Sequence, residues 1–106
     1  MYKIISTDLF REDVRLNRDY IRDELQNPIA ALSFLKELKK KSEYLKEMPN
    51  ANPLIKDTLL ASLGYRLIKV KEYLLFYCVN EPEKKVILER LLYSHRDYNS
   101  ILKYKK

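Results

Sequence analysis

Three consecutive segments near the C-terminus decide the fold: GYRLIKV (residues 64–70), YLLFYCV (residues 73–79) and VILERLLYSHRDY (residues 86–98). Each is rich in aromatic and branched apolar residues, a composition typical of β-strands. The links between them, Lys71-Glu72 and residues 80–84, are short enough for hairpin turns. The sequence therefore predicts three successive strands joined by two hairpins.

The last of these segments ends in a cluster of basic and aromatic side chains. It contains Tyr93, Arg96, Tyr98 and the only histidine of the chain, His95. Cations of this kind can hold a phosphate backbone while aromatic rings stack on bases. We therefore expect the function to reside at this end of the sheet.

The N-terminal residues predict a strand followed by a helix. Residues 2–6 favour an edge strand, and Thr7 or Asp8 offers an oxygen that can cap the first helical turn. The helix is expected over residues 9–25, with charged residues, Asp13 among them, on its outer face. The side chains expected on its inner face are Leu9, Val14, Asn17, Ile21 and Leu25.

A second helix is predicted over residues 28–46. Asn27 is a favourable cap, and Pro28 suits the first position because its missing amide would be unpaired there. Since almost nothing joins the two helices, they are expected to form an antiparallel hairpin. The lysines at 39–41 are interpreted as a solvated face, with phosphate contact as the alternative. The expected apolar stripe consists of Leu32, Leu35, Leu38, Ser42 and Leu45.

The most apolar predicted strand needs to be buried on both of its faces. Residues 48–53 are a loop by composition, and residues 54–63 are expected to hold one helical turn. Residues 73–79 have no polar alternation, which indicates a strand buried on both faces. One helical hairpin covers a single face, so the C-terminal tail or a partner chain is expected to cover the other.

Length and composition restrict the class of protein. A chain of 106 residues makes one domain, residues 1–106, and it contains no apolar run of membrane-spanning or leader length. The single cysteine, Cys78, lies in the most apolar strand and is expected to be a small core residue. No cluster of Cys and His indicates a structural metal site, and neither a metal nor another cofactor is expected. These features favour a cytoplasmic location.

The net charge of +6 is unevenly distributed. Residues 63–106 carry ten basic and five acidic side chains, a net charge of +5, whereas residues 1–27 carry a net charge of −1. A basic excess on the sheet and tail suits an anionic partner, either nucleic acid or an acidic protein segment.

The order of strand, helical hairpin, loop, three strands and basic tail resembles the RelE/ParE superfamily of bacterial toxins. The resemblance covers nearly the whole chain and rests on NP (27–28), AA (30–31), MP (48–49), GYRL (64–67), Val70, Tyr73, FYCV (76–79) and V-x-L-x-RLLY-x-x-RDY (86–98). It implies an α+β fold, with the helical hairpin on one face of a small, twisted, largely antiparallel four-stranded sheet and a short C-terminal helix or tail. It also implies a cognate antitoxin that lies across the toxin and neutralises it.

Members of this superfamily differ in their target. RelE-like members cut mRNA on the ribosome, whereas ParE-like members poison DNA gyrase and have no nuclease site. For this chain we favour a metal-independent, ribosome-dependent mRNA interferase, with gyrase inhibition as the alternative. In such an endoribonuclease His95 would be a general acid or base, and Arg66 and Arg96 would hold the phosphate. The remaining candidates are Tyr98 for catalysis and Lys69, Lys71 and Tyr93 for RNA contact.

Several neighbouring residues have structural interpretations beside the functional ones. Ile68 and Leu74 stand where RelE-like members carry further cations, and His95 is alternatively an ordinary strand-end residue. Three tyrosines are expected to pack in the sheet or core rather than bind bases: Tyr65, Tyr73 and Tyr77.

Two charged residues of the last segment are expected to serve structure. Arg90 lies among apolar neighbours and is interpreted as an ion-pairing residue, with Asp97 or a helix carboxylate as its partner. Asp97 is expected to orient Arg96 or to cap the tail.

Overall fold

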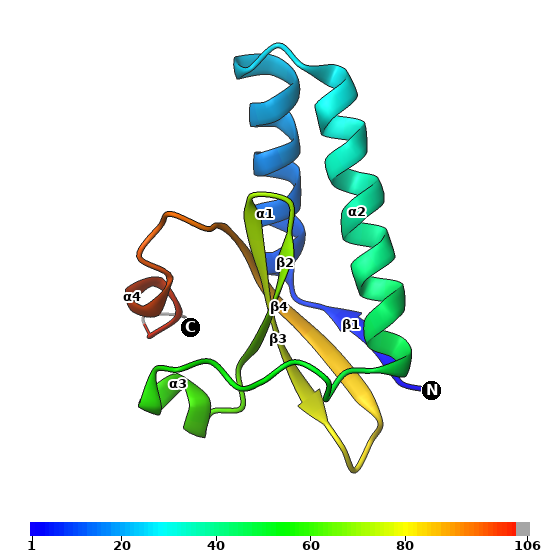
Figure 1. Cartoon of the computed structure of the whole chain (residues 1–106), viewed down its shortest axis with the longest axis vertical. Coiled ribbons are helices and arrows are strands. Elements are labelled where there is room, and N and C mark those ends of the chain that lie inside the picture. The colour runs from blue at the N-terminus through cyan, green and yellow to red at the C-terminus, as the bar shows by residue number, and fades with distance from the viewer. Residues whose placement is uncertain (104–106) are drawn as a thin grey trace.

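The structure, a computed structural model, describes residues 1–103. In chain order its elements are β1 (Lys3–Ser6), α1 (Asp8–Asp19), the π-helical turn η1 (Tyr20–Glu24), α2 (Pro28–Glu47), α3 (Thr58–Ser62), β2 (Arg66–Val70), β3 (Tyr73–Asn80), β4 (Lys85–Tyr93) and α4 (Tyr98–Lys103) (Figure 1). The α+β order predicted from the sequence is confirmed. The predicted tail runs to Lys106, so its residues 104–106 lie outside the described residues.

A mixed sheet forms the centre of the molecule. Within residues 1–103 it has four strands in the order β1-β4-β3-β2. The pairs β2–β3 and β3–β4 are antiparallel, and the edge strand β1 runs parallel to β4. Both hairpins turn through a residue in the left-handed region, Lys71 with φ 57° and Lys84 with φ 53°. The predicted hairpins and edge strand are therefore confirmed.

The two long helices form the predicted antiparallel hairpin and cover one face of the sheet (Figure 1). Thr7 Oγ1 caps α1 by accepting from the Phe10 amide at 3.0 Å, and it donates to the Glu89 carbonyl of β4 at 3.0 Å. Asn27 caps α2 by accepting from the Ala30 amide at 3.0 Å. Within residues 1–103, none of the helices combines the length and the apolarity that crossing a membrane requires.

The buried face of α1 differs from the predicted one. Phe10 and Asp13 are buried at 6% and 8% exposure, whereas Leu9 and Leu25 are 42% and 56% exposed. Leu25 follows the π-helical turn, where its amide bonds to the Tyr20 carbonyl five residues earlier, and this wider spacing rotates it away from the core. The predictions that Leu9 and Leu25 face inward and that Asp13 faces solvent are therefore wrong.

The buried face of α2 is rotated relative to the predicted leucine stripe. Leu32 is 62% exposed, and the prediction for it is wrong. Leu35 is partly buried, and Leu38 and Leu45 are buried as predicted. In this orientation the Phe34 ring, rather than Leu32, faces the sheet. It packs on Tyr73 of β3 with ring centroids 5.0 Å apart. The buried positions of this helix are Ala31, Phe34, Leu38 and Leu45.

The chain itself covers the second face of the sheet. A second core joins α3, α4 and the segment before β2 to the strands, through Ile55, Leu60, Tyr65, Phe76, Leu92 and Leu102. Asp57 caps α3 by accepting from the Leu60 amide and also pairs with Lys103 of α4 at 2.8 Å, and these bonds lower the pKa of its carboxyl group. A partner chain is therefore not needed to bury this face. Cys78 is partly buried against this core rather than inside it.

A buried ion pair joins α1 to the centre of β4. Arg90 Nε lies 2.7 Å from Asp13 Oδ2 and Arg90 Nη2 lies 3.0 Å from Asp13 Oδ1. The Leu91 amide also donates to Asp13 Oδ2 at 2.9 Å. These charge-assisted bonds raise the pKa of the Arg90 guanidinium above its ordinary value. The prediction of a structural arginine with a helix carboxylate as its partner is confirmed.

Candidate functional site

The end of β4 carries an exposed aromatic and basic cluster. Tyr93 is the last residue of β4, and its ring lies 5.1 Å from the His95 ring and 5.7 Å from the Tyr73 ring. His95 and Arg96 are exposed in the turn that follows. The Ser94 amide donates to the Glu72 carbonyl at 3.0 Å, which holds this turn against the tip of the β2–β3 hairpin.

The hairpin tip brings one further predicted residue to this cluster. Lys71 is exposed in the two-residue turn, beside Glu72. The structure therefore gathers Lys71, Tyr93, His95 and Arg96 at one end of the sheet. Burial raises the pKa of the neighbouring Tyr73 hydroxyl. Tyr73 is buried and its ring packs on Phe34 and Tyr93.

Arg66 lies at the opposite end of β2. Its Nη1 donates to the Asn52 carbonyl, which fastens the loop between α2 and α3 to the sheet. In the same region the Tyr77 hydroxyl accepts from Asn52 Nδ2 at 3.1 Å and donates to the Pro49 carbonyl at 2.9 Å. Burial raises the Tyr77 pKa, although the Asn52 bond opposes this. The prediction that Tyr77 is a core residue is confirmed, and the Arg66 guanidinium is engaged with a backbone carbonyl.

Tyr98 begins α4 on the second face of the sheet. Its ring packs on Phe76 with centroids 5.1 Å apart, as part of the second core. Asp97 caps this helix by accepting from the Ser100 hydroxyl at 2.9 Å and from the Ser100 amide at 3.4 Å. The capping role predicted for Asp97 is confirmed, and the structure gives Tyr98 a packing role.

The predicted nuclease residues therefore fall into separate places. Arg66 pairs with Tyr77 of β3, whereas Tyr93 pairs with Tyr73, four residues along the same strand. At about 3.4 Å per residue, this places the two ends of the candidate site about 14 Å apart along β3. Tyr98 packs against the second core, on the opposite face of the sheet from Tyr73 and Tyr77. Lys69 is exposed on the edge strand β2. The seven predicted site residues therefore do not form one active centre.

An apolar hollow adjoins the exposed cluster. It lies between η1, the start of α2 and the hairpin tip, and its volume is about 670 Å³. Tyr20, Leu25 and Tyr93 line it while being 51%, 56% and 41% exposed. Reasoning from sequence did not identify Tyr20, and it placed Leu25 on the buried face of the first helix, whereas Leu25 is exposed after the π-helical turn. Ile21, Ala30 and Tyr73 form part of its floor.

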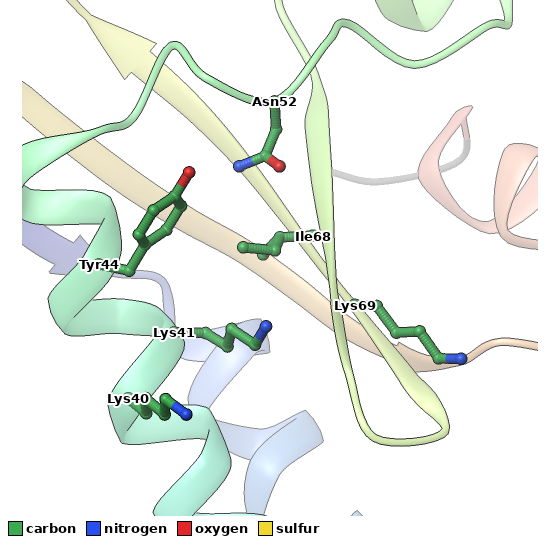
Figure 2. Close-up of a pocket in the computed structure, with 6 residues that line it drawn as sticks. All are labelled: Lys40, Lys41, Tyr44, Asn52, Ile68 and Lys69. Atoms are coloured by element: carbon green, nitrogen blue, oxygen red, sulfur yellow. The ribbon is translucent and has the colours of Figure 1, made fainter.

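A basic groove lies between α2 and the edge strand β2. Lys40, Lys41 and Tyr44 rise from α2, and Ile68 points from β2 into the space between the two elements (Figure 2). Asn52 lies above them, and Lys69 extends from the other side of β2 (Figure 2). Reasoning from sequence identified the lysine run but not its position beside the sheet edge, which only the packing of α2 determines.

Glu81 is one carboxylate whose bonds serve structure. Glu81 in the β3–β4 turn accepts from Asn50, Tyr2 and Lys84, and these bonds lower the pKa of its carboxyl group. In the part of the chain that the structure describes, no three or more His, Cys, Asp or Glu side chains gather as the ligands of a metal ion would.

Comparison with known proteins defines the family. The family model described as "ParE toxin of type II toxin-antitoxin system, parDE" matches residues 4–98. No curated protein is similar enough in sequence to be matched. Similar solved structures include the chromosomal ParDE system from P. aeruginosa, with TM-score 0.70, 16% identity and coverage of 88% of this chain and 96% of that one.

Two further solved structures share the fold. A RelBE toxin–antitoxin complex from Mycobacterium tuberculosis gives TM-score 0.58 at 17% identity, covering 87% of this chain and 96% of that one. The isolated E. coli RelE toxin gives TM-score 0.59 at 19% identity, covering 97% of each chain. Since the family model covers nearly the whole chain, from within β1 to the start of α4, the chain belongs to the ParE toxin family of type II toxin–antitoxin systems.

Proposed function

We propose that this protein is a toxin that inhibits DNA gyrase and that a cognate antitoxin neutralises it. Its membership in the ParE family supports the toxin role. ParE-like members of the superfamily that the sequence resembles act on gyrase. The P. aeruginosa and M. tuberculosis structures contain toxin–antitoxin systems, which supports an antitoxin as partner here.

Gyrase is favoured over mRNA as the target because the residues predicted for RNA cleavage lie far apart. Cleavage of RNA by its own 2′-hydroxyl needs an acid, a base and phosphate-binding cations around one phosphodiester. Here Arg66 is bonded to a loop carbonyl and Tyr98 is packed on Phe76. His95 lies beside Tyr93, which pairs with the first residue of β3, whereas Arg66 pairs with Tyr77 four residues further along that strand. A toxin that acts by binding a protein target does not require these groups to converge.

The second candidate is a ribosome-dependent mRNA interferase. The exposed Tyr93–His95 ring pair favours it, because a base can stack on such rings and a histidine can transfer a proton near neutral pH. Arg96 and Lys71 would supply positive charge beside it. In this candidate the active site is restricted to the end of β4, without Arg66 and Tyr98.

Replacing His95 by alanine separates the two candidates. We expect His95→Ala to retain full toxicity in a bacterial growth assay, because inhibition of gyrase needs no proton transfer from this side chain. A nuclease that used His95 as acid or base would lose activity by about 100-fold or more. Lys56→Ala, at an exposed position with no proposed role, is the control and should be as toxic as the parent at equal expression. A thermal melt verifies that His95→Ala is folded.

A further inference from the structure

The lysines of the basic groove between α2 and β2 are largely without carboxylate partners. Lys40 and Lys69 have no ion pair within residues 1–103, and Lys41 has a distant one, 3.7 Å from Glu37. Positive charge that the protein itself does not neutralise attracts an anionic ligand. The groove therefore has the charge of a binding site for a polyanion.

The positive charge continues beyond the groove along the exposed side of α2. Residues 36–46 contain five lysines and two glutamates, a net charge of +3, and both glutamates are already paired with lysines of the same helix. Lys36 and Lys39 are exposed and have no ion pair in the part of the chain that the structure describes. Since Lys36 lies one helical turn before Lys40, their side chains are neighbours on the helix surface.

These lysines lie on both sides of an open edge of the sheet. β2 is the last strand, and from Ile68 to Val70 no other segment within residues 1–103 is paired with its outer side. Lys41 lies on the α2 side of this edge, and Lys69 extends from the other side (Figure 2). A polyanion along the edge would therefore meet cations on both sides, and outward backbone amides of β2 would donate to its oxygens.

The composition of this surface favours the backbone of duplex DNA over other polyanions. A duplex carries one phosphate charge per about 1.7 Å of its axis, so lysines on successive turns of α2 and on β2 each find a phosphate within reach. Binding of a single strand relies on exposed rings that stack on bases, and among its described residues the groove offers one ring, Tyr44, which is 41% exposed. Lysine contacts phosphate as a point charge and lacks the planar fork with which arginine reads a base. The expected binding is therefore independent of sequence and dependent on salt.

We propose that the lysines around the edge of β2 bind the phosphate backbone of duplex DNA. Lys40 and Lys41 contact phosphates on the α2 side, Lys69 contacts them on the other side, and Lys36 and Lys39 extend the contact along the helix. This site goes beyond the proposed function, because the toxin itself holds the DNA without gyrase. Binding is measured without gyrase and without cells, so the DNA site and the proposed function fail separately.

The probe is a fluorescent twenty-base-pair duplex of mixed sequence, titrated with the purified full chain and followed by fluorescence anisotropy at several salt concentrations. We expect saturable binding that the double variant Lys40→Ala, Lys69→Ala weakens by about tenfold or more at about 0.1 M salt. The slope of log affinity against log salt should fall by about two, since each lost phosphate contact removes about 0.9 from it. The matched control, Lys3→Ala, Lys56→Ala, removes the same charge at exposed positions outside the groove and should bind like the parent.

Three results would overturn this assignment. The first is an absence of binding at about 0.1 mM protein, the weak end of the range for sequence-independent contacts with DNA. The second is an equal loss of affinity in the control variant, which would make binding a property of net charge and not of the groove. The third is displacement of the duplex by polyglutamate or by single-stranded or double-stranded RNA at a lower charge concentration than unlabelled duplex DNA requires, which would assign the groove to another polyanion.

Discussion

Replacing Arg90 by alanine is expected to lower the free energy of unfolding by about 3–5 kcal/mol, because the Asp13 carboxylate would remain buried without its cation. Asp13 is held at 11% side-chain exposure by contacts with Arg90 and with the Leu91 amide, so it cannot move into water without disturbing α1 and β4. Urea unfolding of the purified protein measures the loss.

The matched control is Arg11→Ala. Arg11 also pairs with an aspartate of α1, but its side chain is 57% exposed, and such pairs contribute about 0–1 kcal/mol. If Arg90→Ala unfolded at the same urea concentration as the parent and lost toxicity, Arg90 would belong to the functional site and the structural assignment would be reversed.

Phe76→Ala is expected to destabilise the protein by about 3–5 kcal/mol, the usual cost of deleting a buried aromatic side chain. Phe76 is fully buried at the centre of the second core, where it packs on the Tyr98 ring of α4. Hydrogen exchange should show that the amides of α4 lose protection, in addition to the loss of overall stability, because α4 is held by the Phe76–Tyr98 contact.

Leu59→Ala is the control for this effect. Leu59 lies on α3 at the same face of the sheet but is 52% exposed, so we expect less than about 1 kcal/mol. A similarly small loss in Phe76→Ala would mean that α3 and α4 do not form a stable core with the sheet.

The strands and helices were predictable because their signals are local. The pair of hairpin turns, the Asn27-Pro28 helix start and the apolar run of β3 each depend on a few adjacent residues. The helix faces were less predictable, since the inward turn of Asp13 depends on Arg90, 77 positions away. The π-helical turn that exposes Leu25 has no comparable sequence signal.

The candidate site was predictable only in part. The cluster of Tyr93, His95 and Arg96 is contiguous in sequence, so its position at the end of β4 follows from the strand itself. The position of Arg66 relative to this cluster depends on strand register and on the loop carbonyl of Asn52. Long-range register and side-chain partners of this kind are not encoded in local patterns.

Our proposal is that this toxin acts on gyrase and not on mRNA. Its most direct test is a supercoiling assay with purified protein, DNA gyrase, ATP and relaxed plasmid, run beside a ribosome reaction that translates a labelled mRNA. We predict that the protein blocks supercoiling or traps cleaved plasmid while the mRNA remains intact. Normal supercoiling together with ribosome-dependent cleavage of the mRNA would contradict gyrase as the target.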